Sequence, residues 1–216
     1  MVSYWCSSCK KTTAHSKQDE KWVVCKRCNT KRSSKKIRSA WEHQKTLKQQ
    51  KLSTPEDIYN KARSITHPMH QALFVLCYLT AGRITEVLEL TKDRITTAPE
   101  MPNVMLIDLP NRKNKKKSHK LIPINLNNEF EKKLFKLVLE YISNVPDSQT
   151  LFHHTRQWGW RTLRKYDFNP HFLRHIRLTH LVTQRNFSDQ KLAMFAGWTD
   201  SRGAKPYMEL KWRDLL

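Results

Sequence analysis

Four cysteines stand in two closely spaced pairs near the start of the 216-residue chain. Cys6 and Cys9 form the first pair, and Cys25 and Cys28 form the second after an interval of 15 residues. Two residues between cysteines let a tight turn point both sulfurs at one metal ion, and two such turns complete a tetrahedral thiolate site. We therefore predict structural Zn²⁺ held by these four cysteines. Because such a shell is closed, the metal should take no part in catalysis.

Two other uses of paired cysteines fit less well. Disulfides would need an oxidising compartment, and the sequence shows no secretory signal. A redox dithiol is a poor match for two pairs at this spacing. His15, between the pairs, is expected at the surface because four sulfurs already fill the shell, and Cys77 is expected in a core. Thirty or so residues cannot hold a core alone, so zinc should supply the folding energy of a ribbon over residues 1–31.

The charge of the chain points to a polyanionic partner. The formal net charge is +21, and residues 1–52 carry 14 Lys and Arg against 3 Asp and Glu, a net charge of +11. Half of the excess thus lies in a quarter of the chain, as expected for an arm that binds DNA or RNA rather than for a merely solvated surface. Residues 32–52 are a basic linker or helix, which could follow a DNA backbone or act as a spacer.

The same composition argues against a membrane protein. The longest apolar run, Ala72 to Leu79, has eight residues, and a spanning helix needs roughly 20. Lysines interrupt the start of the chain and no apolar signal segment follows them. We expect no membrane partner and a cytoplasmic location.

Four later segments resemble, in order and spacing, the tyrosine recombinases, or phage-type integrases. The stretch 80–90, TAGRITEVLEL, resembles their first arginine box. A basic hairpin that ends K-L-I-P at Pro123 resembles their catalytic-lysine hairpin. The stretch 171–175, HFLRH, resembles their second box, and A-G-W at 196–198 is followed by Tyr207 nine residues after Trp198. The likeness covers residues 54–210.

The resemblance implies in-line attack of a tyrosine hydroxyl on a DNA phosphodiester, which yields a covalent 3′-phosphotyrosine and a free 5′-hydroxyl. Arg83 and Arg174 are the implied clamps, because a fixed guanidinium fork suits phosphate oxygens better than a mobile ammonium. His171 would assist proton transfer at the tyrosine, Trp198 would buttress the pocket and Tyr207 would be the nucleophile. Bond energy is conserved through the intermediate, so we expect no ATP and no catalytic metal.

The resemblance also implies a lysine that protonates the leaving oxygen. Counting back eight positions from Pro123, as in the usual hairpin of the family, gives Lys115 as the general acid. The tip looks longer than usual here, so Lys113 is the alternative. His175 and Thr179 are expected to support the fold rather than to react.

These residues need a particular set of elements to position them. Thr54 and Pro55 are a helix-start signal, and Glu86, three residues after Arg83, could orient that arginine. Strand-like runs at 104–107 and 121–124 flank a hairpin tip at 111–118. The expected fold class is α+β and mostly helical, a recombinase-like catalytic domain with a small antiparallel β-hairpin sheet, preceded by a small zinc ribbon. Helical patterns cover 55–65, 69–80, 84–90, 128–143, 171–184, 188–196 and 205–214.

The domain organisation expected is a zinc ribbon at 1–31, a basic linker or helix at 32–52 and a tyrosine recombinase catalytic domain at 53–216. The function expected is site-specific recombination or integration of double-stranded DNA for a mobile element or virus, in a prokaryotic cell, by a dimer or tetramer assembled on DNA. One alternative is a nicking-closing enzyme similar to type IB topoisomerases or telomere resolvases. The other is a zinc-ribbon DNA-binding protein on a decayed recombinase fold.

Overall fold

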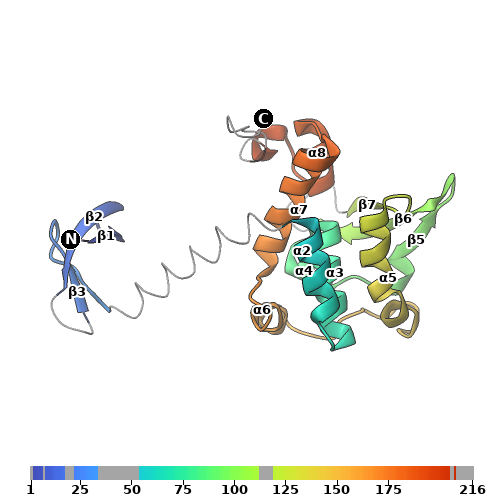
Figure 1. The fold of residues 1–216 in the computed structure, drawn as a ribbon, viewed down its shortest axis with the longest axis horizontal. Helices are drawn as coiled ribbons and strands as arrows, with labels where there is room; N and C mark the ends of the chain where they lie inside the picture. Colours follow the sequence, from blue (N-terminus) through green and yellow to red (C-terminus); the bar gives the residue numbers. More distant parts are fainter. Residues whose placement is uncertain are drawn as a thin grey trace. The chain divides into compact units, whose positions relative to one another are not determined.

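The computed structural model describes residues 2–6, 8–17, 22–33, 54–111, 119–204 and Tyr207. The chain divides into two compact units, residues 1–49 and 50–216, and each is described by itself (Figure 1). Three expectations lie largely outside the described residues. These are the linker beyond residue 33, the hairpin tip at 112–118 and, apart from Tyr207, the helix at 205–214.

The first unit is an antiparallel sheet with the strand order β1-β2-β3-β4. Two tight turns interrupt it, at residues 8–10 and 26–28, and each follows a strand that ends in a cysteine. Lys10 and Asn29, at the ends of these turns, have left-handed backbones with φ of 50° and 54°. Each turn therefore brings its second cysteine back toward the first. The strands are β1 (Val2–Cys6), β2 (Lys11–Lys17), β3 (Trp22–Cys25) and β4 (Lys31–Ser33).

The second unit is built around helix α3 (Pro68–Thr80), which is buried along its length from Ala72 to Thr80. Cys77, on this helix, is fully buried as expected. Helix α2 (Pro55–Ser64) begins with a capping box, in which Thr54 and Asp57 each accept a hydrogen bond from the other's backbone N–H. Figure 1 shows α3 in the middle of the unit, where it packs against three further helices. These are α5 (Glu129–Ser143), α6 (Arg156–Arg164) and α7 (Pro170–Arg185).

A short helix and a small sheet follow α3. Helix α4 (Ile84–Leu88) ends two residues earlier than expected, and the 3-10 turn η1 (Lys92–Arg94) leads into the sheet. The sheet has the antiparallel order β5-β6-β7, with Ile107 paired to Ile122. The inward side chains of β6 and β7 alternate with exposed ones and join the helical core. Its strands are β5 (Ile95–Ala98), β6 (Met101–Pro110) and β7 (His119–Asn125).

The last described part carries α7, α8 (Asp189–Ala196) and the 3-10 turn η2 (Ser201–Ala204). The expected helices over 171–184 and 188–196 match α7 and α8 within about a residue. Helix α6 and strand β5 had no counterpart in the sequence prediction. Helix α6 has only nine residues, fewer than the window of about 11–18 residues over which a helical period is read from a sequence.

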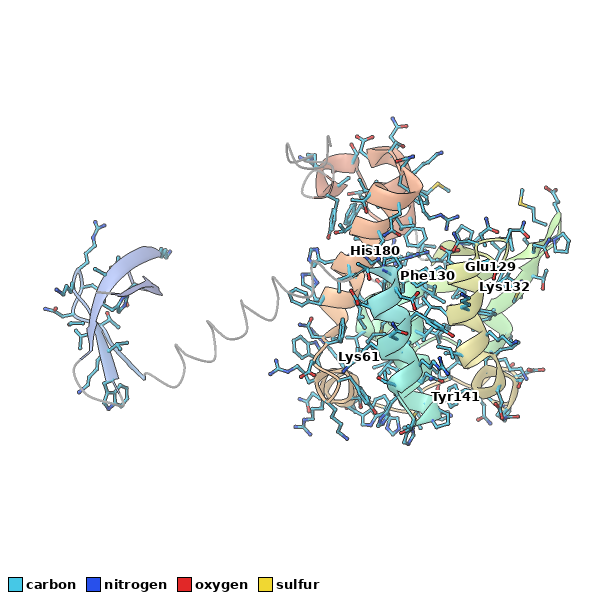
Figure 2. The ribbon with its side chains drawn as sticks, in the orientation of Figure 1. Lys61, Glu129, Phe130, Lys132, Tyr141 and His180 are labelled. Carbon is cyan, nitrogen blue, oxygen red and sulfur yellow. The ribbon has the colours of Figure 1, made fainter. Side chains whose placement is uncertain are left out.

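A polar network lies inside the helical core. The Tyr78 hydroxyl is 2.7 Å from Nδ1 of His180, and the ring of Phe130 packs edge-on against Tyr78. Figure 2 labels His180 and Phe130, two of the residues that contact Tyr78. Beside them, Glu131 forms ion pairs with Arg177 and Arg185. These ion pairs connect Glu131 on α5 to two arginines on α7, and they fix how the two helices pack against each other. None of the helices in the described parts of the chain is both long enough and apolar enough to span a bilayer.

Candidate active site and metal centre

Arg83 lies at a sharp turn between α3 and α4. Ala81 has a left-handed backbone with φ of 44°, and a Cβ on Gly82 would come within 2.7 Å of Cγ2 of Val87, so glycine is required there. The backbone N–H of Arg83 donates to Oε2 of Glu86 at 2.9 Å, and its Nη1 donates to Oε1 at 2.6 Å. The contact expected from the three-residue spacing is therefore present, and it orients the guanidinium.

Glu86 also pairs with a lysine that the sequence reasoning did not single out. Nζ of Lys120, at the start of β7, lies 3.2 Å from Oε2 of Glu86, and both side chains are buried. Burial opposes ionisation of Glu86, but the charge of Lys120 and the hydrogen bonds from Arg83 outweigh it and lower the pKa of Glu86. Burial lowers the pKa of Lys120 to about 8, against the raising effect of Glu86. Glu86 thus joins Arg83 and Lys120 in one ion cluster, in which the side chains of Glu86 and Lys120 are buried.

Residues at the base of the basic hairpin, one on each side of its tip, contact the elements that form the site. Asn111, which follows β6, donates from Nδ2 to the carbonyl oxygen of Gly197 at 3.1 Å. Gly197 ends α8 with a left-handed φ of 69°. On the other strand, Lys120 is held by Glu86. Lys113 and Lys115 lie in the segment between these anchors, outside the described residues.

Arg174, on α7, is buried and reaches the ends of two other helices. Its Nη1 donates to the carbonyl oxygen of Ala81 at 2.5 Å, and its Nη2 donates to that of Ala196 at 3.0 Å. The guanidinium also lies over the ring of Trp198, 5.8 Å from the ring centroid. Burial, followed by the like charge of Arg83, lowers the pKa of Arg174 to about 10. The group stays cationic at neutral pH, and two carbonyls fix its plane.

Tyr207 is half-buried beside these arginines. Its ring packs against Trp198 with centroids 6.1 Å apart and against His175 with centroids 5.4 Å apart. Burial raises the pKa of Tyr207 to about 12, against the opposing charge of Arg174. A buried hydroxyl of this kind needs a partner that takes its proton before it can act as a nucleophile.

The structure places His175, rather than His171, against this hydroxyl. Nδ1 of His175 hydrogen-bonds to the Tyr207 hydroxyl, and its Nε2 lies 3.0 Å from Nε2 of His171. Burial, then the charges of Arg174 and Arg83, lower the pKa of His171. From the sequence, His175 is expected to support the fold, because the resemblance assigns the proton-transfer role to His171. The two histidines are four residues apart on one face of α7, so spacing alone could not separate them.

These groups surround one cavity of about 530 Å³. Helix α6 contributes Arg156 and Trp160, two residues with no predicted role, since the sequence pattern indicated no helix there. The cavity thus brings together the predicted residues Arg83, His171, Arg174, Trp198 and Tyr207 from four parts of the chain. Its other lining residues are Gly82, Ile84, Thr85, Pro170, His175 and Gly203.

The four predicted metal ligands also come together, in the first unit. Their sulfurs all lie within 4.8 Å of one another, with Cys6 and Cys28 at 3.5 Å and Cys9 and Cys25 at 3.9 Å. Around a tetrahedral zinc with Zn–S bonds of about 2.3 Å, the sulfurs would lie about 3.8 Å apart. The cluster therefore has the size that a four-thiolate metal centre requires.

Two threonines support this cluster. The hydroxyls of Thr13 and Thr30 lie 3.0 Å from the sulfurs of Cys25 and Cys28, and the contact with Thr13 is the main reason that the pKa of Cys25 is lowered to about 5. Hydroxyl donors of this kind favour the thiolates that bind metal. The expectation for His15 is wrong. It is 3% exposed, because β2 turns it inward and its Nδ1 donates to the Thr13 carbonyl at 2.8 Å.

Comparison with solved structures finds the fold of this chain, over 74% of its length, in two recombinases. The XerH site-specific recombinase, in its pre-cleavage complex with the difH substrate, matches with a TM-score of 0.56 and 15% identity, over 74% of this chain and 50% of that chain. The XerA recombinase matches with a TM-score of 0.52 and 18% identity, over 74% and 60%. This chain thus spans between half and three fifths of their lengths. At these identities the likeness shows the fold, and it confirms the expected α+β, mostly helical class.

The sequence itself carries a family signature. Among curated proteins, none matches the sequence. The phage integrase family, however, matches residues 54–212, nearly the span over which the resemblance was seen. The chain therefore belongs to the phage integrase family of tyrosine recombinases.

Proposed function

We propose that this protein cleaves and rejoins double-stranded DNA at specific sites through a covalent 3′-phosphotyrosine. One observation carries the proposal. The Tyr207 hydroxyl and the guanidinium groups of Arg83 and Arg174 line a single cavity, with both arginines held by partners other than a substrate. A phosphodiester in this cavity would meet a nucleophile and two fixed cations.

In the cleavage step, the oxygen of Tyr207 attacks phosphorus and the bond to the 5′-oxygen breaks. Arg83 and Arg174 stabilise the negative charge on the non-bridging oxygens, and their held geometry means that little reorganisation is needed. Trp198 supports the pocket by packing on both Arg174 and Tyr207. In the rejoining step a 5′-hydroxyl attacks the phosphotyrosine, so no high-energy cofactor is consumed.

The leaving 5′-oxygen needs a proton, for which we propose Lys115, with Lys113 as the alternative. The anchored residues Asn111 and Lys120 support this assignment, since they hold the base of the hairpin beside the site. Substitution of the active lysine should slow cleavage by about 10²–10⁴, the range for a lost general acid. A substrate with a 5′-bridging sulfur should restore the rate, because a thiolate leaves without a proton.

The first unit is proposed to be a zinc ribbon that adds DNA affinity. Cys6, Cys9, Cys25 and Cys28 would hold the ion, and its chemistry would be structural. We propose the division into a ribbon at 1–31, a basic segment at 32–52 and a catalytic domain at 53–216. The enzyme would act for a mobile element or virus and would assemble on DNA as a dimer or tetramer.

The proposal is tested by trapping the covalent intermediate. The probe is a library of DNA duplexes with a randomised core and a 5′-bridging phosphorothiolate, which traps the adduct because the released thiolate re-attacks poorly. Wild type should form an adduct that survives denaturation and maps to Tyr207, and sequencing of the trapped DNA gives the target. Tyr207→Phe keeps the ring and removes the hydroxyl, so it should bind DNA without forming the adduct. An adduct in Tyr207→Phe would contradict the proposal.

The same reagents separate the alternatives. Strand exchange between two duplexes that carry the selected target indicates recombination, and relaxation of supercoils without exchange indicates a nicking-closing enzyme. DNA binding with no adduct from wild type would favour the non-enzymatic alternative and overturn the proposal.

A further inference from the structure

A chain of three polar side chains crosses the wall of the cavity. It runs from the Tyr207 hydroxyl to Nδ1 of His175, and from Nε2 of His175 to Nε2 of His171 at 3.0 Å. His175 and His171 lie one turn apart on α7, with ring centroids 4.4 Å apart. His175 is thus placed between the proposed nucleophile and the histidine of the second box.

The hydrogen bonds allow one proton arrangement in which Tyr207 is the donor. If the phenol donates to Nδ1 of His175, the neutral imidazole must carry its own proton on Nε2. That N–H then donates to Nε2 of His171, which must be unprotonated. The lowered pKa of His171, caused by burial and by Arg174 and Arg83, favours this neutral state. The contacts therefore form one continuous donor-to-acceptor path that leads away from Tyr207.

The arginines that line the cavity, unlike the two histidines, cannot take the proton of the phenol. The guanidinium groups that line the cavity are donors without an acceptor atom. Because burial raises the pKa of Tyr207 to about 12, very little phenolate exists at neutral pH, and attack must be coupled to proton transfer. The charged and titratable described groups that line the cavity with His175 are His171 and Arg174 on its own helix, and Arg83, Arg156 and Tyr207 from other elements.

We propose that His175 is the general base that accepts the proton of Tyr207 during cleavage and returns it during rejoining. As the bond from the phenol oxygen to phosphorus forms, the O–H bond breaks and its proton moves to Nδ1 of His175. The bond from phosphorus to the 5′-oxygen breaks, and that oxygen takes its proton from the hairpin lysine. His171 accepts a hydrogen bond from the new imidazolium and stabilises it. This inference rests on the proposed function.

The test uses His175→Asn, because the amide oxygen of asparagine can take the place of Nδ1 and accept the hydrogen bond without accepting a proton. The matched control is His153→Asn, an exposed position whose ring contacts Thr150 instead of the cavity. The probe is the selected duplex with either an oxygen or a bridging sulfur at the 5′ position. His175→Asn should bind DNA normally and cleave about 10²–10⁴ more slowly, and the control should cleave at the wild-type rate.

The sulfur substrate and a rescue experiment distinguish the role from its rivals. Sulfur should not restore the rate of His175→Asn, because the defect lies at the nucleophile and not at the leaving group. Added imidazole should restore cleavage by His175→Ala, in proportion to its neutral form. Full activity of His175→Asn, rescue by sulfur, or no rescue by imidazole would each overturn the inference. If wild type still forms the Tyr207 adduct, any of these results overturns only the role of His175, and the proposed function stands. If wild type forms no adduct, both the proposed function and the role of His175 are overturned.

Discussion

The ammonium nitrogen of Lys120 lies 3.2 Å from Oε2 of Glu86, and the same oxygen accepts the backbone N–H of Arg83 at 2.9 Å. A lysine at the base of the basic hairpin is thereby joined to the arginine that begins α4. The carboxylate between them is fully buried. The ion pair between Lys120 and Glu86 thus connects the hairpin to the turn that carries Arg83. We expect this ion pair to affect the free energy of unfolding and its dependence on pH.

Lys120→Met removes one partner of the buried ion cluster and keeps the length of the side chain. Breaking a buried pair typically lowers the free energy of unfolding by about 3–5 kcal/mol, and the value here should be at or below that range because Arg83 still pairs with Glu86. Urea unfolding of both proteins measures the change. The control is Lys132→Met, because its pair with Glu129 is exposed (Figure 2) and should contribute less than about 1 kcal/mol. Equal losses of unfolding free energy in Lys120→Met and Lys132→Met would contradict the burial of the pair between Lys120 and Glu86.

The lowered pKa of Lys120 predicts a pH dependence of stability. Its pKa is about 8 in the folded protein against an ordinary 10.5, so between these values the unfolded chain holds a proton that the folded chain has released. The free energy of unfolding of wild type should therefore rise with pH in this window relative to Lys120→Met, and the difference should be constant below it. Unfolding curves of the two proteins at a series of pH values test the sign. If the free energy of unfolding of wild type, relative to Lys120→Met, falls as the pH rises above 8, the prediction is wrong.

Arg174→Lys tests the value of a fixed guanidinium. A lysine cannot donate to the carbonyls of Ala81 and Ala196 and still present a fork to the phosphate. We expect the cleavage rate to fall by about 10²–10³, as for the loss of one oriented donor, while DNA affinity changes little. Single-turnover cleavage and a binding titration measure the two effects. Arg161→Lys, on the exposed side of α6, is the control and should keep the wild-type rate.

The cysteine cluster predicts about one zinc ion per chain. Cys28→Ser should abolish stoichiometric zinc, and chelation should unfold the first unit without removing the helical signal of the second, since the second unit has its own core. Elemental analysis and circular dichroism measure these outcomes. Cys77→Ala is the control, because Cys77 belongs to the core of the second unit and its loss should leave the zinc content unchanged. A zinc-free wild type would contradict the metal centre.

The basic arm predicts a change in the salt dependence of binding. Residues 1–52 carry a net charge of +11, so their deletion should weaken DNA affinity and make the slope of log affinity against log salt shallower, because fewer counterions are released. Binding titrations at several salt concentrations give both values. An unchanged slope would mean that the arm does not contact DNA phosphates.

Several features of this protein were determined by the sequence alone, because their physics is local. The spacing of Cys6, Cys9, Cys25 and Cys28 predicted the sulfur cluster, since each tight turn depends on only four residues. Thr54 and Pro55 predicted the start of α2 for the same reason. The order of the arginine, histidine and tyrosine segments was enough to indicate the family, which the match over residues 54–212 confirms.

Other features were decided only by the tertiary structure. His171 and His175 share one face of α7, and which ring meets the Tyr207 hydroxyl depends on where Tyr207 arrives from another part of the chain. Lys120 looks like one more basic residue of a charged hairpin, and only the packing of β7 against the turn at Glu86 buries it. Arg156 and Trp160 reach the cavity because α6 packs against α3 and α4. Each of these roles is a contact between distant segments, which no local pattern of residues encodes.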